Sequence, residues 1–227
     1  MSSLRQSKVE HKIHTHCFDY DIYLNLRNKP ADNANNPYVV FLDEDMVTHP
    51  DYIFQNISPP VSEFQYYSVL TKFFKKFEME TGLKIKFAVH PKSRNKNLSN
   101  LLKDIVCVKG NTAELVKDSK AVLLHASTSL SYAVLFKKPA IFLTSNELKK
   151  SWIGNRIDNF AKTINGQLIN MDNNLNKKLD LQSLLKIDED KYKNYLDQYL
   201  KVPDSPDIPS WQILTDNLKN KKFEKLN

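Results

Sequence analysis

Three short clusters of polar residues carry side chains that could act on a phosphate or a sugar. They are the acidic run Asp43 to Asp45, the run His90 to Arg94 (HPKSR) and the run His125 to Ser129 (HASTS). Each cluster directly follows a short apolar run of the kind that forms a buried strand. In a doubly wound sheet, ligands bind outside the carboxyl ends of the strands. We therefore expect the three clusters to meet at one edge of a sheet.

The hydroxyls of Ser127, Thr128 and Ser129 stand where a predicted strand ends and an apolar helix begins. Free backbone N–H groups and the helix dipole favour an anion at such a junction, and hydroxyls can add donors to phosphate oxygens. The pattern predicts a phosphate site, with His125 at its start. An ordinary Ser or Thr helix cap is the alternative, and it would explain one of the three hydroxyls.

An imidazole at a predicted strand end, followed by proline and two cations, suits a phosphate leaving group. His90 can donate to a phosphoryl oxygen, and Lys92 and Arg94 can stabilise charge as a bond to phosphate breaks. A loop histidine beside solvated cations remains the alternative. His49 also precedes a proline, but it follows no predicted strand, so we rank it below His90.

The acidic run offers a base for an attacking sugar hydroxyl. Asp43 or Glu44 could take that role. Together with Asp45 they could equally bind a metal, form a polar turn or cap a helix. The chemistry of this cluster therefore stays open at the level of the residues alone.

The chain from Asn36 onward alternates short apolar runs with longer amphipathic ones, a pattern typical of an α/β fold with a Rossmann-like, mainly parallel sheet and helices on both faces. Strands are predicted at 39–43, 84–90, 105–108, 121–126, 140–144 and 167–170. Helices are predicted at 61–81, with Gly82 as a stop, and at 112–118, 128–136, 148–164, 181–185, 192–200 and 211–218. We expect three segments: a lead and linker (1–36), a Rossmann-like nucleotide-sugar-binding domain (37–172) and C-terminal helices packed on that domain (173–227).

The composition bounds the class of protein. The chain has 227 residues, 41% hydrophobic and 26% charged, which fits one folded domain. It has no apolar run near the roughly 20 residues of a membrane span and no secretory start at Met1, so we expect a soluble, cytoplasmic protein. Cys17 and Cys107 lack disulfide or zinc spacing and are expected to be buried free thiols. The net charge of +7 suits nucleic acid, an anionic membrane or a phosphorylated ligand without choosing among them.

The order of the three clusters resembles the bacterial glycosyltransferases that carry a His-Pro motif and a later Ser/Thr motif, a group that includes sialyl-, polysialyl- and Kdo-transferases. The resemblance runs from about Tyr38 to Met171. The segment Asn111 to Thr144 also resembles the C-terminal nucleotide-binding half of GT-B transferases and of the teichoic-acid glycerophosphate polymerases. In these proteins a strand, a Ser-rich helix start and a Lys-Pro before the next strand recur, and Lys138 and Pro139 occupy that last place.

The resemblance implies roles for the three clusters. His90 would contact the nucleotide of a CMP-sugar, Ser127 to Ser129 would hold its phosphate, and Asp43 or Glu44 would be the base. In that group a glycine follows the acidic pair, whereas here the residue is Asp45. GT-B enzymes also place the site between two lobes, and this chain has room for one. Either a partner chain or the tail completes the site, or the chain is a donor-binding remnant.

These features together predict a glycosyltransferase that moves a sugar from a nucleotide donor, a CMP-sugar for preference, to a glycan of a bacterial surface polysaccharide such as capsule or lipopolysaccharide. We expect inversion without a metal and no cofactor, with the nucleotide-sugar as substrate. The expected partners are a glycan or lipid-linked glycan acceptor and a second lobe or partner chain, with peripheral membrane association left open and no nucleic acid. The alternatives are a phosphopolyol transferase of the teichoic-acid type and a non-catalytic nucleotide-binding domain of a larger assembly.

Overall fold

The computed structural model describes residues 11–31, 36–173, 177–220 and 224–225. The strands are β1 (His11–Lys12), β2 (Tyr38–Leu42), β3 (Lys84–Val89), β4 (Val106–Lys109), β5 (Val122–Leu124), β6 (Ala140–Thr144), β7 (Gln167–Asn170) and β8 (Glu224–Lys225). The helices are α1 (Phe18–Leu26), α2 (Pro50–Gln55), α3 (Glu63–Thr81), α4 (Leu98–Leu101), α5 (Thr112–Asp118), α6 (Leu130–Leu135), α7 (Asn146–Lys150), α8 (Gly154–Thr163), α9 (Leu181–Leu184), α10 (Glu189–Tyr195), the π-helical turn η1 (Leu196–Leu200) and α11 (Ser210–Lys219).

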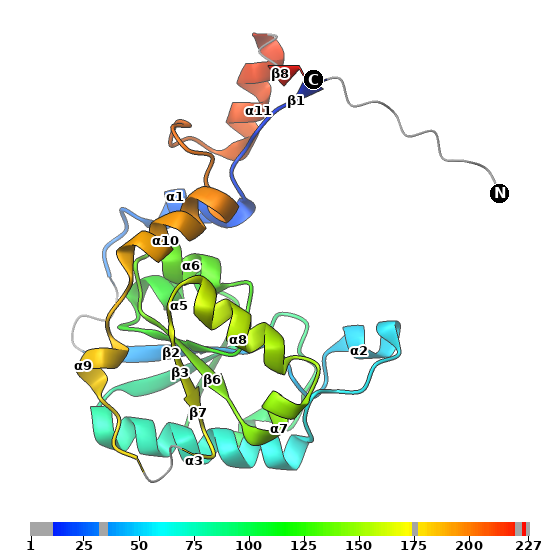
Figure 1. Cartoon of the computed structure of the whole chain (residues 1–227), viewed down its shortest axis with the longest axis vertical. Coiled ribbons are helices and arrows are strands. Elements are labelled where there is room, and N and C mark those ends of the chain that lie inside the picture. Colours follow the sequence, from blue (N-terminus) through cyan, green and yellow to red (C-terminus); the bar gives the residue numbers. More distant parts are fainter. Residues whose placement is uncertain (1–10, 32–35, 174–176, 221–223, 226–227) are drawn as a thin grey trace, which may run out of the picture.

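The described residues form a six-stranded parallel sheet in the order β4-β3-β2-β5-β6-β7. Figure 1 shows α3 on one side of this sheet and α5, α6 and α8 on the other. The fold is therefore the expected α/β, Rossmann-like one. Strand order reverses between β2 and β5, and the crevice at such a reversal is where doubly wound sheets bind ligands.

The core lies where the central strands meet α3. All residues of β2, β5 and β6 are buried, as expected for parallel strands covered on both faces. The Phe41 ring of β2 lies 5.3 Å from the Phe74 ring of α3 and 5.1 Å from the Phe87 ring of β3. The long helix ends, as predicted, at Gly82, whose φ of 70° is the left-handed conformation that glycine adopts without strain.

Several predictions about elements differ from the structure. The segment 148–164, expected to be one helix, is broken between α7 and α8, where the backbone of Ser151 is extended with a ψ of 171°. Gly154, at the start of α8, permits a close approach to the Lys149 carbonyl oxygen, from which a Cβ would lie 2.7 Å away. The N-terminal lead holds α1, whose Tyr20 and Leu26 are buried. Cys107 is a free thiol but is exposed rather than buried, because β4 is an edge strand of the sheet.

The C-terminal helices pack partly on the sheet domain and partly on the N-terminal segment. The Tyr192 hydroxyl on α10 donates to the Lys138 carbonyl oxygen at 2.9 Å. Beyond η1 the chain turns to α1, where the Ser210 hydroxyl lies 3.0 Å from both the His16 carbonyl oxygen and the Asp21 carboxylate. In Figure 1, α11 with β1 and β8 forms an arm that extends away from the sheet. None of the helices in the described ranges is both long and apolar enough to cross a membrane.

Candidate functional site

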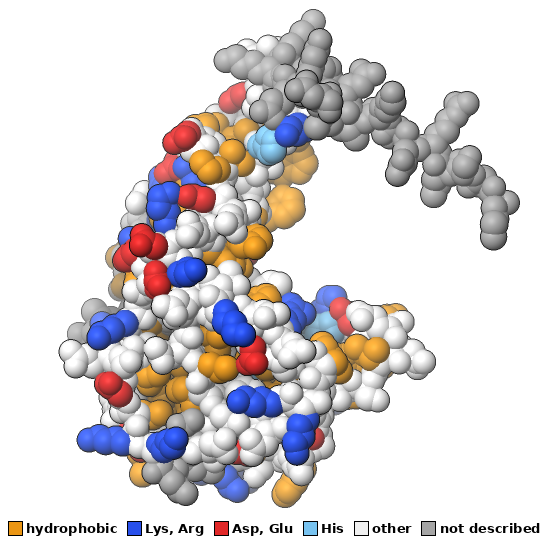
Figure 2. Space-filling view, viewed as in Figure 1, with side chains coloured by type: hydrophobic (Ala, Val, Ile, Leu, Met, Phe, Trp, Pro, Cys, Tyr) orange, Lys and Arg blue, Asp and Glu red, His pale blue; other side chains and the backbone are white. Residues whose placement is uncertain are grey.

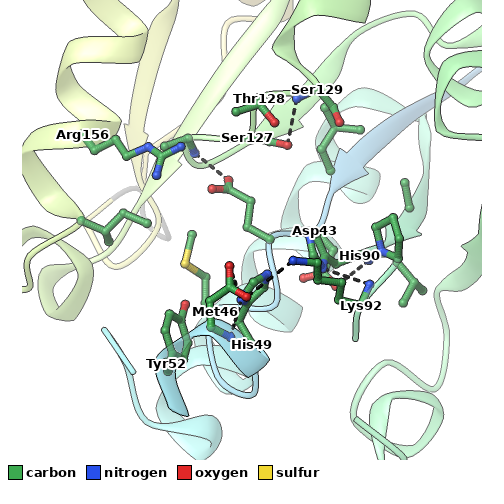
Figure 3. Close-up of a pocket in the computed structure, with 18 of the residues that line it drawn as sticks. Asp43, Met46, His49, Tyr52, His90, Lys92, Ser127, Thr128, Ser129 and Arg156 are labelled. Carbon is green, nitrogen blue, oxygen red and sulfur yellow. Dashed lines mark hydrogen bonds and ion pairs between the residues drawn. The ribbon is translucent and has the colours of Figure 1, made fainter. Parts of the chain in front are cut away.

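A cavity of about 650 Å³ opens at the carboxyl edge of the sheet, across the ends of β2, β3 and β5. Residues of α2 and α8 complete its walls. Because the order of strands reverses between β2 and β5, the cavity lies at the position where this fold binds ligands. It brings together most of the residues that the sequence singled out (Figure 3): Asp43, Glu44, His90, Lys92, Ser127, Thr128 and Ser129.

Asp43 ties the ends of two neighbouring strands together. One of its carboxylate oxygens accepts the Asp45 N–H at 2.9 Å and the other accepts the His90 N–H at 3.0 Å. Burial raises the pKa of Asp43 to about 6, although both backbone donors favour the charged form. Both oxygens of Asp43 already accept backbone N–H groups. Asp43 is therefore placed to fix the geometry of the site, and it is less well placed to accept a proton.

Glu44 connects the end of β2 to the junction after β5. Its Oε1 accepts the Ala126 N–H at 2.6 Å and the His125 N–H at 3.2 Å. Burial raises the pKa of this carboxyl to about 8, and the Ala126 hydrogen bond and the Arg156 charge oppose the rise. No described residue hydrogen-bonds its second oxygen, and the residue lines the cavity. Glu44 is therefore the better placed of the two carboxylates for proton transfer.

Asp45 does not line the cavity. Its φ is 49°, the left-handed conformation in which glycine is unstrained and aspartate is one of the tolerated residues. One carboxylate oxygen accepts both the backbone N–H and the hydroxyl of Thr48, at 3.1 and 2.6 Å. Asp45, which stands where the resemblance implies a glycine, thus adopts a conformation that glycine favours.

His90 lines the cavity beside a second imidazole, His49. The two ring centroids lie 4.8 Å apart. In each residue Nδ1 accepts the backbone N–H two positions on, at 3.2 Å from Asp51 for His49 and at 3.3 Å from Lys92 for His90. An accepting Nδ1 leaves the proton of the neutral ring on Nε2. Both rings therefore have an N–H donor left for a ligand.

The charge state of His90 follows from its surroundings. Burial lowers its pKa below the usual value, and the neighbouring His49 lowers it further. The lowered pKa favours the neutral form of the His90 ring in the free protein. A neutral imidazole still donates one hydrogen bond, and an anion bound beside it would favour the protonated form.

The loop Ser127 to Ser129 lies between β5 and α6. The Ser127 hydroxyl accepts the Ser129 N–H at 3.3 Å, while Ser129, at the N-cap position of α6, makes no side-chain cap hydrogen bond. Thr128 is exposed at the cavity. The Ser127 hydroxyl thus makes the kind of bond that an ordinary cap makes, which accounts for one of the three hydroxyls. The hydroxyls of the loop lie where they can contact a bound group.

Two predicted residues lie away from this cavity. His125 is fully buried, with Nδ1 2.7 Å from the Leu143 carbonyl oxygen and Nε2 3.0 Å from the Tyr66 hydroxyl. Because a carbonyl only accepts, Nδ1 carries the proton, and burial lowers the pKa of His125 to about 4. The His125 side chain therefore joins α3 to the sheet and does not lie where it could bind a phosphate in the cavity. Arg94 lines an adjoining groove instead. Lys92 lines both this groove and the cavity.

The structure adds cavity residues that the sequence did not single out or ranked low. His49 and Tyr52 come from α2 and its start, and Trp152 and Arg156 from the region of α7 and α8. The Tyr52 and Trp152 rings meet edge-on with centroids 6.1 Å apart. In the sequence, the one local signal for this wall was the second His-Pro pair, His49 and Pro50. Within the described ranges, no group of three His, Cys, Asp or Glu side chains is arranged to hold a metal ion.

Comparisons with known proteins give distant structural neighbours. No family model and no curated protein matches the sequence. Among solved structures, the glycosyltransferase SnogD from Streptomyces nogalater matches with a TM-score of 0.45 at 10% identity, over 85% of this chain and 46% of that one. The glycotransferase of kitacinnamycin matches with a TM-score of 0.41 at 8% identity, over 73% of this chain and 39% of that one.

A third structural neighbour belongs to a different enzyme class. The Methanocaldococcus jannaschii UDP-GlcNAc 2-epimerase, solved with UDP-GlcNAc and UDP, matches with a TM-score of 0.40 at 12% identity, over 90% of this chain and 49% of that one. The chain thus spans less than half the length of these three neighbours. Likeness at this level does not assign an activity.

Proposed function

We propose that the chain binds a nucleotide-sugar, with a CMP-sugar as the favoured donor, and moves the sugar to a glycan acceptor of a bacterial surface polysaccharide. The observation that carries this proposal is the single cavity lined by Glu44, His90 and Ser127 at the reversal of strand order. A carboxylate, an imidazole and a hydroxyl loop are the groups that sugar transfer from a phosphate needs.

The reaction is one displacement at the sugar carbon that carries the phosphate. Glu44 takes the proton of the acceptor hydroxyl, whose oxygen forms the new bond to that carbon. The bond from the carbon to the phosphate oxygen breaks, and its electron pair leaves with the phosphate. His90, Lys92 and the loop hydroxyls stabilise the departing charge. Attack from the face opposite the phosphate inverts the configuration.

Arg156 adds a second cation to this assignment. It lines the same cavity from α8 and interacts electrostatically with Glu44. A guanidinium forms paired hydrogen bonds to phosphate oxygens. With a phosphate bound in the cavity, the Arg156 charge would offset the repulsion between the leaving group and the Glu44 carboxylate.

One observation also suits a non-catalytic binding domain. The Glu44 Oε1 holds two backbone N–H groups, which is a structural role that a domain without activity would use equally. The test is consumption of CMP-sugar and other nucleotide-sugar donors by the chain, with and without glycan acceptors and candidate partner chains. Donor turnover that is lost in Glu44→Gln supports the enzyme. Nucleotide binding without turnover under any of these conditions would replace it with the binding domain.

A further inference from the structure

Helix α2 forms one wall of the cavity and turns an apolar face outward. His49, Tyr52 and Gln55, one helical turn apart, line the cavity. Ile53 and Phe54 lie on the other side of the helix, 83% and 85% exposed. Figure 1 shows α2 projecting from the body of the fold. Two large side chains with no polar atoms are thus presented at the tip of a projection.

Trp152 anchors the α2 projection through two contacts. The Trp152 indole N–H donates to the Ser58 carbonyl oxygen at 3.3 Å, and the Trp152 ring contacts Tyr52. Trp152 is itself half exposed. Ile53 and Phe54 are therefore exposed on a segment that is anchored to the rest of the fold. The Trp152 indole beside this segment has one polar and one apolar edge.

Cations stand next to the apolar tip. Phe54 shares a groove with Lys92, Arg94 and Lys109, and Asp51 is the one acidic residue lining it. Figure 2 shows hydrophobic side chains over the α2 projection with Lys or Arg side chains beside them. The groove therefore has an excess of positive charge, in a chain whose net charge is +7.

We propose that the α2 tip and its cationic groove, meaning Ile53, Phe54, Arg94 and Lys109, dock the protein on an anionic lipid surface. Exposed apolar side chains insert at the boundary of headgroups and acyl chains, where they need no hydrogen-bond partner. Neighbouring cations bind the anionic headgroups. A protein partner would have to pair the same cations with acidic side chains and also cover a small, isolated apolar tip. A lipid surface meets both needs with its headgroups and acyl chains.

Docking through α2 places the cavity at the lipid surface, because the same helix supplies the cavity wall. An acceptor anchored in the membrane would then reach the site from the lipid side. The binding surface is separate from Glu44, Ser127 and Arg156, so it goes beyond the proposed activity. Docking through α2 can therefore be tested without measuring donor turnover.

The experiment is co-sedimentation of the full chain with vesicles of phosphatidylcholine alone or mixed with phosphatidylglycerol. Binding should require phosphatidylglycerol and weaken as salt is raised. Ile53→Ser with Phe54→Ser should lower binding about tenfold or more, since each replaces a large apolar side chain that the lipid would bury. Met79→Ser is the matched control, because Met79 is equally exposed, at 83%, near the far end of α3.

A second variant tests the charge. Arg94→Ser with Lys109→Ser should weaken binding to the anionic vesicles, and thermal melting should show that all variants are folded. Binding that is absent, or that the Ile53 and Phe54 changes leave intact, would overturn the proposal. So would concentration-dependent dimers, without vesicle binding, that the same two changes abolish, because α2 would then bind a second copy of the chain.

Discussion

The two neighbouring carboxyls at the end of β2 have different hydrogen-bond surroundings, and this separates their roles. Both Asp43 oxygens bind backbone N–H groups of the site, whereas one Glu44 oxygen has no hydrogen-bond partner among the described residues. The sequence offered either residue as the base. The contacts favour Glu44.

Replacing these carboxyls should separate turnover from stability. Glu44→Gln keeps an oxygen for the Ala126 N–H, so nucleotide affinity should stay near wild type while turnover falls about a hundredfold or more. Asp43→Asn puts an amide donor against a backbone donor, so it should lower the free energy of unfolding by about 1–3 kcal/mol. Donor turnover, calorimetric titration and thermal melting of both variants measure these effects.

The pH profile identifies the base in the wild-type chain. The group that takes the proton must be deprotonated in the free enzyme, so kcat/KM should rise with pH through the pKa of that group. The pKa of about 8 predicts a rise near pH 8 for Glu44, and the pKa of about 6 predicts one near pH 6 for Asp43. A profile that rises near pH 6 and is flat above it would contradict the assignment to Glu44.

The two imidazoles should act as a pair of donors. His49→Asn retains an acceptor for the Asp51 N–H but removes the Nε2 donor, whereas His49→Gln can retain a donor near the Nε2 position. Affinity for CMP should fall about tenfold in the Asn variant, in line with the loss of a hydrogen bond to a charged group, and less in the Gln variant. Equal affinities in calorimetric titrations of the two variants and the wild type would show that His49 does not contact the nucleotide.

At the level of elements, the Asp207 carboxylate links the segment between η1 and α11 to α1. Asp207 accepts from the Tyr20 hydroxyl at 2.8 Å, from Arg27 at 2.6 Å and from Lys201 at 3.1 Å. The Arg27 hydrogen bond is the largest of the effects that hold the pKa of Asp207 well below its usual range. One of the contacts of this segment with α1 therefore uses a charged carboxylate, which makes that contact sensitive to acid.

Asp207→Asn should lower Tm by about 2–4 °C, equivalent to about 1 kcal/mol, because partly exposed ion pairs are screened by solvent. A folded-state pKa below the unfolded one gives stability that is present above about pH 4 and is lost as the pH falls further. The variant should lack this part of the acid sensitivity. Asp104→Asn, in the exposed pair with Lys75, is the control and should leave Tm and its pH dependence nearly unchanged.

The central strands could be predicted from sequence because burial on both faces leaves apolar runs that end at polar turns. Of these strands, β6 matches its predicted bounds and β2 is shifted by one residue, and the edge strand β7 also matches its predicted bounds. The break at Ser151 could not be predicted, because the packing of Gly154 against the Lys149 carbonyl that accompanies it is a contact in space. For the same reason no local pattern pointed to Tyr52 or Arg156, which reach the cavity from elements outside the three motifs.

At the scale of the whole molecule, one sheet brings residues from distant parts of the sequence to a single cavity. Glu44 and Ala126 are joined by a hydrogen bond across β2 and β5, although 82 positions separate them. His125, by contrast, matched its motif and yet is a core residue. Motif order thus located the edge of the sheet, while burial and hydrogen bonding decided which motif residues face the cavity.

We propose that this cavity binds a nucleotide through its phosphate. Calorimetric titration of the full chain with CMP, CDP, UDP and GDP tests this proposal. We predict that CMP, or another member of this set, binds at one site per chain. The combined changes Ser127→Ala, Thr128→Ala and Ser129→Ala should weaken that binding by about 1–3 kcal/mol, the range for removing donors from a charged group. A chain that binds none of the four nucleotides, or whose affinity the three changes leave intact, would contradict the claim.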